Sequence, residues 1–336
     1  MLAFDPRTAA EATLAATHAV LSASERREDP EVPPMPLAEL VATSRHERSF
    51  VRDPCLLVVD SEEPIALVRL HLNDYRPEIA GLEVHLRSLD RVDLVVGPLR
   101  EAARAAQEAG CRSVIASVPR GSPVEARLAG LGFTLGMVER ISRLRTADLD
   151  RELLESWVTR AAERAREYSL VGWDGACPDE WLDRFVPLRM VMNTAPTEDL
   201  DWPEETSTVD RLRASEESLA AIGHRFWILA ARHDPTDALV GYTQVGLNGH
   251  RPALAEQGDT AVDPAHRDRG LGRWLKAVMA LRLLDEAPEV EIIDTGNAES
   301  NAPMLGINVA MGFRPHARHG AWQAPVAILA TGAPTG

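Results

Sequence analysis

Apolar and polar residues alternate along the first half of the chain in segments whose lengths predict both strands and helices. Apolar runs of strand length precede a segment of helical spacing at 97–110, with Pro98 in its first turn and Gly110 past its end. A short helix is expected to open at Ser122. The strands predicted in this half lie at 55–60, 64–72, 81–86, 113–118 and 138–144.

The second half of the chain shows the same order of elements. A helix is expected to begin at Gly270 or Leu271, because the apolar residues that follow recur with the spacing of one buried face. Another helix would be capped by Ser300 or Asn301 and end at Gly312. The other elements predicted here are helices at 178–192 and 209–222 and strands at 168–173, 226–232, 239–247, 253–262 and 290–294.

The repeated order predicts a degenerate tandem repeat of one domain type. Its two halves close on similar phrases, LGF at 131–133 and MGF at 311–313. A chain of 336 residues with 45% hydrophobic content is long enough for two separate cores. We therefore expect two domains, at 1–147 and 148–336.

Charge and cysteine content restrict the possible partners. The formal net charge is −15, so broad neutralisation of a nucleic-acid backbone or an anionic membrane is not expected. The chain has no apolar stretch of about 18 residues, and its start lacks the pattern of a signal peptide. Three scattered cysteines favour a reducing compartment. We expect a cytoplasmic protein, either a monomer or a homodimer.

One segment reverses the overall sign of the charge. Residues 266–276 (HRDRGLGRWLK) carry four cationic side chains and only one acidic one. They connect a predicted strand to a predicted helix, where free backbone N–H groups and the helix dipole favour an anion. Gly270 and Gly272 leave the backbone open to close approach of a ligand. The segment therefore predicts a site for a pyrophosphate.

Two familiar phosphate-binding patterns are absent from the sequence. It contains neither G-x-x-x-x-G-K-[ST] nor G-x-G-x-x-G with an acidic residue about 20 positions later, so nucleoside triphosphates and dinucleotides are not expected. The ten histidines show no metal-ligand spacing, and no metal site is expected.

The segment 267–272 (RDRGLG) resembles the acyl-CoA signature of the GNAT superfamily of N-acyltransferases, in which Gln or Arg is followed by x-x-G-x-G/A. An Asn-rich turn at 295–301 and a helix that ends in Gly-Phe strengthen the resemblance. Tandem GNAT proteins of actinobacterial type look most similar, with mycothiol synthase as a distant example. The resemblance implies an α/β (α+β) fold of two GNAT-like domains, each a mixed, mostly antiparallel sheet flanked by helices.

The resemblance also implies how acetyl-CoA, or another short acyl-CoA, would bind. The pantetheine arm would lie between the strands at 253–262 and 290–294, with Asn297 and Asn301 near it; a turn and a helix cap are the alternative roles for these two residues. Lys276 is a further candidate for a phosphate. The other residues implied in cofactor binding are Thr260, Ala261, Val262, Arg267, Asp268, Arg269, Gly270, Leu271, Gly272 and Arg273.

Acyl transfer to an amine needs a base, because an alkyl ammonium titrates near 10. Glu256 occupies the position of the base glutamate of similar family members, with Asp259 and Asp294 as weaker candidates. Alternation would put Glu256 on the same face as Gly258 and Thr260 unless a β-bulge intervenes.

Asn308 stands where the family usually has a tyrosine acid, and the segment 295–313 contains no tyrosine. Asn308 could hydrogen-bond the departing sulfur, while Tyr242 or His266 could assist as the acid. A backbone N–H near Ala261 or Val262 would stabilise the oxyanion.

The sequence thus predicts an enzyme, an acyl-CoA-dependent N-acyltransferase that acts on a small-molecule amine by direct attack in a ternary complex. Two alternatives remain: acetylation of a thiol-cofactor precursor, as by mycothiol synthase, and a non-catalytic acyl-CoA sensor or scaffold. The first half has Gly97-Pro98 where a cradle would stand, and it is expected to bind no CoA.

Overall fold

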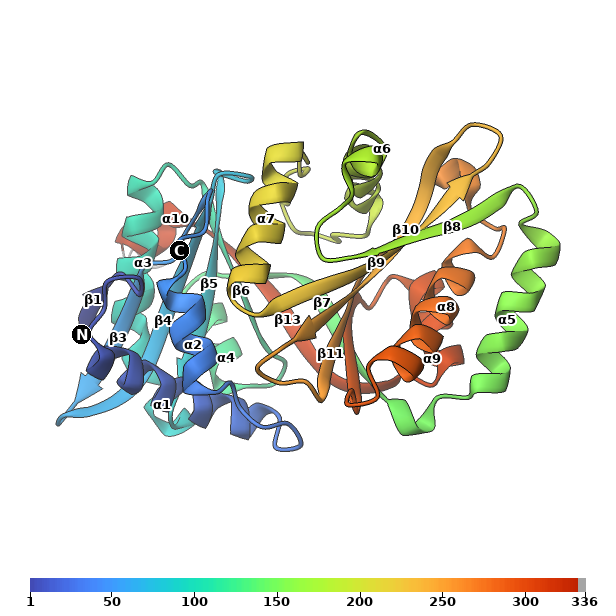
Figure 1. Ribbon diagram of the computed structural model, residues 1–336. Helices are drawn as coiled ribbons and strands as arrows, with labels where there is room; N and C mark the ends of the chain where they lie inside the picture. Colours follow the sequence, from blue (N-terminus) through green and yellow to red (C-terminus); the bar gives the residue numbers. More distant parts are fainter. Residues whose placement is uncertain (332–336) are drawn as a thin grey trace. The chain divides into compact units, whose positions relative to one another are not determined.

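The structure is a computed structural model that describes residues 1–331. The chain divides into two compact units. Unit 1 consists of Met1–Glu139, Thr197–Glu204 and the described part of Arg318–Gly336, and unit 2 consists of Arg140–Pro196 and Glu205–Ala317. Each unit is a mixed, mostly antiparallel sheet with helices on its faces, as predicted (Figure 1).

In unit 1 the strand order is β1-β3-β4-β5-β6-β13, with β2 paired to β4. All its neighbouring strands with a described register are antiparallel except β5 and β6, which run parallel. The elements are β1 (Leu2–Phe4), α1 (Glu11–Glu28), α2 (Leu37–Arg45), β2 (Val51–Arg52), β3 (Cys55–Asp60), β4 (Glu63–Asn73), β5 (Ile79–Leu86), η1 (Leu89–Val95), α3 (Val96–Glu108), β6 (Ser113–Pro119), α4 (Pro123–Gly130) and α10 (Val326–Thr331).

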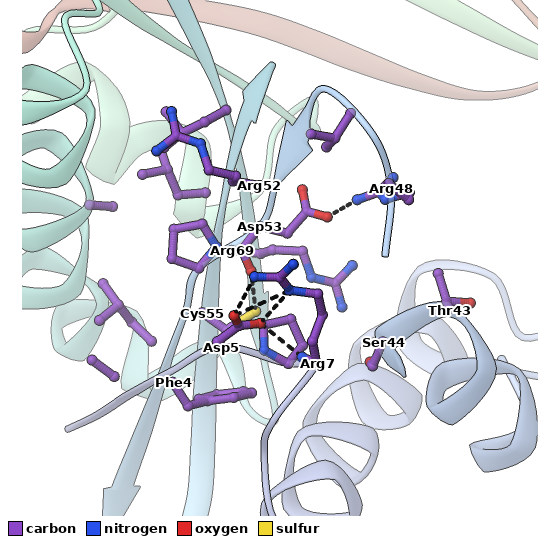
Figure 2. Close-up of a pocket in the computed structure, with 18 of the residues that line it drawn as sticks. Phe4, Asp5, Arg7, Thr43, Ser44, Arg48, Arg52, Asp53, Cys55 and Arg69 are labelled. Carbon is purple, nitrogen blue, oxygen red and sulfur yellow. Dashed lines mark hydrogen bonds and ion pairs between the residues drawn. The ribbon is translucent and has the colours of Figure 1, made fainter. Parts of the chain in front are cut away.

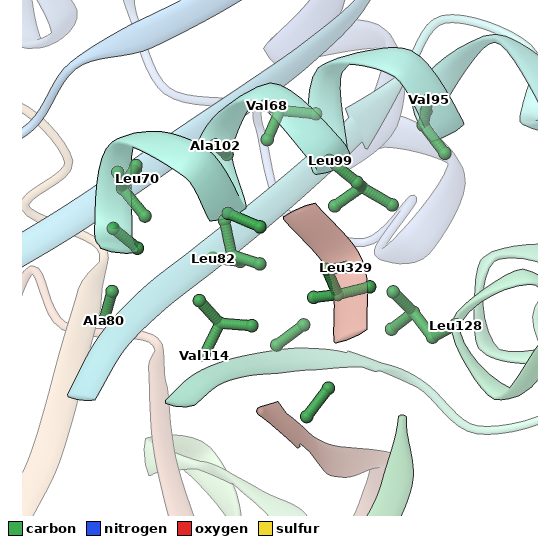
Figure 3. Close-up of a cluster of buried hydrophobic side chains, with 14 of the residues drawn as sticks. Val68, Leu70, Ala80, Leu82, Val95, Leu99, Ala102, Val114, Leu128 and Leu329 are labelled. Atoms are coloured by element: carbon green, nitrogen blue, oxygen red, sulfur yellow. The ribbon is translucent and has the colours of Figure 1, made fainter. Parts of the chain in front are cut away.

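The main core of unit 1 lies between its central strands and helices α3, α4 and α10 (Figure 3). Helix α3 turns Leu99 and Ala102 into this core, and α10 contributes Leu329. Helix α4 begins as predicted, since Ser122 accepts a hydrogen bond from the N–H of Glu125 at 3.2 Å. The last helix of the described residues, α10, therefore stabilises the first unit.

In unit 2 the strand order is β12-β11-β10-β9-β8, and only β11 and β12 are parallel. This arrangement repeats that of unit 1, which confirms the predicted tandem fold. The elements are α5 (Arg151–Arg164), β8 (Tyr168–Asp174), α6 (Asp179–Arg189), η3 (Met190–Thr194), α7 (Val209–Ala221), β9 (His224–His233), β10 (Ala238–Asn248), β11 (Leu254–Val262), η4 (Pro264–His266), α8 (Leu271–Glu286), β12 (Ile292–Ala298) and α9 (Ala302–Met311).

Two strands begin in one unit and end in the other. β7 (Thr134–Arg145) starts in unit 1 and ends in unit 2, whereas β13 (Arg314–Pro325) starts in unit 2 and ends in unit 1. The second half of β13 pairs antiparallel with β6, from His319 opposite Pro119 to Pro325 opposite Ser113. The compact units are therefore not the contiguous segments 1–147 and 148–336, and that boundary stays a prediction about the sequence repeat.

Several elements differ from the prediction. β12 was expected at 290–294 but runs to Ala298, so part of the expected Asn-rich turn is strand. Helix α5 and strand β13 were not predicted as such. Among residues 1–331, helices long and apolar enough to cross a membrane are absent.

Candidate active site

The centre of the site in unit 2 is the point where β11 and β12 separate. The two strands pair in parallel from Leu254 opposite Ile292 to Glu256 opposite Asp294, and the described pairing stops there. Both strands nevertheless continue, to Val262 and to Ala298. The carbonyl oxygen of Gln257 still accepts a hydrogen bond from Thr295 Oγ1 of β12 at 2.9 Å. The edge of β11 that faces β12 therefore has backbone groups available for a strand-like ligand beyond Gln257.

The chain turns into helix α8 just after β11. Gly270 is the N-cap with φ 83°, a left-handed conformation that favours glycine, and no side chain caps the helix. The N–H groups of the first turn have no partner within the helix. A Cβ on Gly272 would touch only Ile307 at 3.5 Å, so the space in front of the helix end is open. This geometry fits the predicted anion cradle.

The basic side chains around this turn are differently engaged. Arg267 donates from Nε to the carbonyl oxygen of Val262 at 3.0 Å and from a terminal nitrogen to Thr194 Oγ1 at 2.9 Å. Arg269 donates to the hydroxyl of Tyr168. Arg273 lies over the ring of Trp157, 5.4 Å from its centroid. Arg267 and Arg269 therefore hold the turn in its conformation. The groups that remain available to an anion are the backbone N–H groups of the turn and the guanidinium group of Arg273.

A β-bulge in β11 decides which side chains share a face. Thr243 of β10 pairs with Thr260, but Val245 pairs with Gln257, so β11 has one extra residue between these pairs. Gln257 Nε2 donates to Thr243 Oγ1 at 3.1 Å, which places Gln257 and Thr260 on the same face. The β-bulge that the sequence analysis left open is present, so Glu256 does not share a face with Thr260.

Glu256 lies on the opposite face of the sheet. It pairs with Gly246, which in turn pairs with Phe226. A Cβ on Gly246 would lie 2.8 Å from Phe226 Cε1, so the phenyl ring covers the space that the glycine leaves open beside Glu256. Burial raises the pKa of Glu256, and the nearby carboxylates of Asp259 and Asp294 raise it further.

Both neighbouring carboxylates are held by other residues. Asp259 accepts a hydrogen bond from the hydroxyl of Tyr242 at 2.9 Å. Asp294 accepts two hydrogen bonds from the buried Arg143, at 2.8 Å from Nε and 2.6 Å from a terminal nitrogen. Glu256 is therefore the carboxylate of this group that has no hydrogen-bond partner among the described residues.

A cavity of about 290 Å³ opens on the same face as Glu256. Phe226 and Gln244 form part of its floor, and helices α6 and α7 form its walls. Its polar groups include Arg189, Arg213 and Glu216, alongside apolar side chains such as Leu212. A small polar molecule with an apolar part fits such a lining.

The asparagines are arranged around the end of β12. Asn308 is buried, and its Nδ2 donates to Asn297 Oδ1 at 2.8 Å, while Asn308 Oδ1 has no hydrogen-bond partner among the described residues. Asn301 caps α9, since its Oδ1 accepts from the N–H of Met304 at 3.3 Å. Asn301 thus has the alternative role of a helix cap, whereas Asn308 leaves one buried acceptor for a ligand.

The sequence analysis did not predict the burial of Lys276, the only lysine in the sequence. It was expected to reach a phosphate, but it is 1% exposed, and its Nζ lies 5.5 Å from the centroid of the Phe313 ring. Burial lowers its pKa to about 7. A buried lysine on the helix that follows the cradle is visible only in three dimensions.

The two alternative acids have other partners. Tyr242 is fully buried, and burial together with Asp259 raises its pKa well above the ordinary value. His266 Nδ1 lies 2.9 Å from the hydroxyl of Tyr168, and burial lowers its pKa. Metal-binding groups of three or more His, Cys, Asp or Glu side chains are absent from the described part of the chain.

The corresponding place in unit 1 is built differently. β5 and β6 also pair only at their starts, from Ile79 opposite Ser113 to Leu82 opposite Ala116. The next segment, however, is the 3₁₀ helix η1, which runs directly into α3 and leaves no glycine-opened turn. Only unit 2 combines separated strands with an open helix end among the described residues.

The separated strands and the open helix end of unit 2 lie within the part of the chain that matches a known protein family. Residues 191–312 match the model of the acetyltransferase (GNAT) family. The chain is similar to a tandem GNAT protein from the clavulanic acid biosynthesis pathway, with 25% identity over 97% of this chain and 98% of that one, at a TM-score of 0.74. The resemblance to tandem GNAT proteins is thereby confirmed.

A GCN5-related N-acetyltransferase from Sphaerobacter thermophilus has the same fold. It is 13% identical over 97% of this chain and 95% of that one, with a TM-score of 0.65. No curated protein sequence matches the chain.

Proposed function

We propose that the protein is an acyl-CoA-dependent N-acyltransferase that acetylates a primary amine of a small molecule. The observation that carries the proposal is the separation of β11 and β12 beyond Glu256, directly in front of the open N-terminus of α8. This geometry suits a long ligand with an extended amide chain and a pyrophosphate. The tandem GNAT relative acts in the biosynthesis of a small molecule, which agrees with a small acceptor.

The residues of unit 2 fit acyl-CoA at both ends. Backbone N–H groups at 268–272 would hold the pyrophosphate, with Arg273 as an additional cation, while Arg267 and Arg269 hold the turn in shape. Backbone groups of Thr260, Ala261 and Val262 would pair with the pantetheine arm, and the unpaired Asn308 Oδ1 would accept one of its N–H groups. The bound cofactor supplies the acyl group as a thioester.

Glu256 is the proposed base. Glu256 lies on the face of the sheet where the 290 Å³ cavity opens, and it pairs with Gly246, whose other partner Phe226 lines that cavity. The acceptor amine would sit between Glu256 and the cavity. Glu256 would take a proton from the ammonium group, directly or through a water molecule, and its raised pKa suits this transfer. A backbone N–H near Ala261 or Val262 would stabilise the oxyanion. Asn308 would not donate a proton to the departing sulfur of the cofactor. Its Nδ2, held in place by the hydrogen bond to Asn297 Oδ1, would instead orient that sulfur.

The test is the release of free CoA from acetyl-CoA in the presence of a panel of small amines, which includes amino sugars and an amine precursor of a thiol cofactor. Glu256→Gln should lower kcat by about 10² to 10⁴ while acetyl-CoA still binds. Glu289→Gln, a change at an exposed residue of the same unit, should leave the rate unchanged. Tight binding of acetyl-CoA without turnover of any amine would instead favour the sensor or scaffold.

A further inference from the structure

Unit 1 contains a second and larger cavity, of about 570 Å³ (Figure 2). It is lined by β1, β2, the start of β3 and the second half of β4, together with helices α2 and α3. None of the lining residues belongs to β5 or β6, whose separation corresponds to the candidate cofactor site of unit 2. The cavity is therefore a different kind of site from the one proposed above.

The walls of this cavity are largely apolar. Leu40, Leu56, Leu70, Leu72 and Ala102 line it, and each is less than 9% exposed. Protein interiors are normally close-packed, so an open volume of this size next to leucine side chains indicates space for a ligand. The size lies within the range of roughly 300–1,000 Å³ that is usual for small-molecule sites.

Four arginines line the same cavity, and three of them have carboxylate partners. Arg7 pairs with Asp5 at 2.9 Å, Arg48 pairs with Asp53, and Arg69 pairs with Glu83 at 3.0 Å. The fourth, Arg52, is exposed and makes no ion pair or hydrogen bond through its side chain among the described residues. Figure 2 shows Arg52, Arg48 and Arg69 around the upper and central part of the cavity.

The carboxylates near these arginines are already shared with histidines. Asp53 accepts a hydrogen bond from His71 Nδ1 at 2.6 Å, and Glu83 lies 2.9 Å from His71 Nε2 and 3.5 Å from His85 Nε2. Burial lowers the pKa of Arg48, and the positive charge of Arg69 lowers it further. The cationic side of the cavity therefore has a surplus of positive charge that an added anion would offset.

The remaining polar groups do not support a reaction at this place. Cys55 donates from Sγ to the carbonyl oxygen of Asp53 at 3.4 Å, and burial raises the pKa of its thiol, so it is a poor nucleophile. Glu101, at the rim, pairs with Arg104. The arrangement is that of a binding site rather than a second catalytic centre.

We propose that this cavity of unit 1 binds a small organic carboxylate with an apolar body. The carboxylate would lie against Arg52, with Arg69 and Arg48 beyond it, because a planar guanidinium binds a carboxylate through two parallel hydrogen bonds. The apolar body would fill the volume between α2, α3 and β4. Unit 1, which lacks the anion cradle of unit 2, would thus have a ligand-binding site of its own.

The experiment uses the full-length protein and three probes that share one apolar body: phenylbutanoate, phenylbutanol and phenylbutylamine. Saturation-transfer NMR or calorimetry gives the affinity for each. The carboxylate is expected to bind at least about tenfold more tightly than the alcohol, and the amine more weakly still. Arg52→Met should remove this preference. It should leave the fold intact, because in the described part of the chain the side chain of Arg52 has no ion-pair or hydrogen-bond partner that the substitution would leave unpaired.

Matched controls separate this site from the proposed active site. Arg87→Met, at an exposed arginine of the same unit that lies outside the cavity, should leave binding of the carboxylate unchanged. Gly272→Asp should abolish acetyl-CoA binding but leave the carboxylate in place. Equal binding of all three probes, no binding of the carboxylate at millimolar concentration, or binding that survives Arg52→Met would overturn the proposal.

Discussion

Arg143 donates two hydrogen bonds to Asp294, of 2.8 and 2.6 Å, and Asp294 is the residue that pairs with Glu256 in the sheet. The guanidinium offsets part of the charge of Asp294, the carboxylate that helps to raise the pKa of Glu256. A residue of β7 thus sets the electrostatic environment of the proposed base.

Replacement of Arg143 by Gln should raise the pKa of Glu256 further, because the negative charge of Asp294 is then uncompensated. The acid limb of kcat/KM should move to higher pH. Asp294→Asn should move it to lower pH. Arg143→Gln should also cost about 2–3 kcal/mol of stability, below the full value for a buried pair because Asp294 is partly exposed. Identical pH profiles for the two variants would refute the coupling.

The pH dependence of the wild type follows from the raised pKa of Glu256. Below that pKa the carboxyl is protonated and cannot accept a proton, so kcat/KM should fall as the pH decreases. The pKa of this fall should lie above 4.5, the ordinary pKa of a glutamate. The raised pKa also means that ionised Glu256 destabilises the fold at pH 7. Glu256→Gln should therefore lose activity but slightly gain thermal stability. Lower stability of this variant at pH 7 would contradict this reading.

Gly272→Ala should weaken acetyl-CoA binding by about tenfold or more without loss of stability. The added Cβ meets only Ile307 at 3.5 Å in the protein itself, so its cost would come from the ligand. Calorimetry gives the affinity, and wild type should bind one acetyl-CoA per chain. Gly306→Ala, in a helix with nothing within 4 Å, is the matched control and should bind normally.

Lys276→Met should stabilise the protein at pH 7. The pKa of Lys276 falls from 10.5 in the unfolded chain to about 7 in the native state, so the unfolded chain binds more protons between these values. Wild-type stability should therefore rise with pH from 7 to 10.5, at most by about 1.4 kcal/mol per unit. Urea unfolding across this range should show that rise in the wild type only; the same slope in the variant would exclude Lys276 as its source.

Leu329→Ala should destabilise the protein by about 2–5 kcal/mol, because the side chain is 2% exposed within the main core of unit 1. Val309→Ala, at a residue that is 55% exposed, is the control with little expected effect. Equal unfolding midpoints for both variants would show that α10 does not contribute to the core.

The sequence was sufficient for much of the fold. Strand-length apolar runs, helix caps such as Ser122 and Asn301, and glycines at helix ends act locally, so they are readable one segment at a time. The pairing of β13 with β6 is different, because it joins residues about 200 positions apart and leaves no local pattern. For the same reason the composition of the two units was not predictable from the join between the repeats.

The candidate site shows the same division. The open helix end after β11 was indicated by Gly270 and Gly272, whose conformational freedom is a local property. The face of Glu256 depended on a bulge, and a bulge depends on the partner strand as well as on the strand itself. The burial of Lys276 and the Arg143–Asp294 pair depend on long-range packing, which composition and spacing do not record.

Strand β13 starts in unit 2 and ends in unit 1, and this has a consequence for how the protein folds during its synthesis. Unit 1 is the first to leave the ribosome, yet its strand β6, which pairs with β5 on one side, gains its second partner only when residues 319–325 have been synthesised. Until then the edge of β6 is exposed to pairing with other nascent chains. The first unit to be translated is therefore the last to be completed, and a chain that stops just before residue 318 would contain all of unit 2 but would lack the last strand and helix of unit 1.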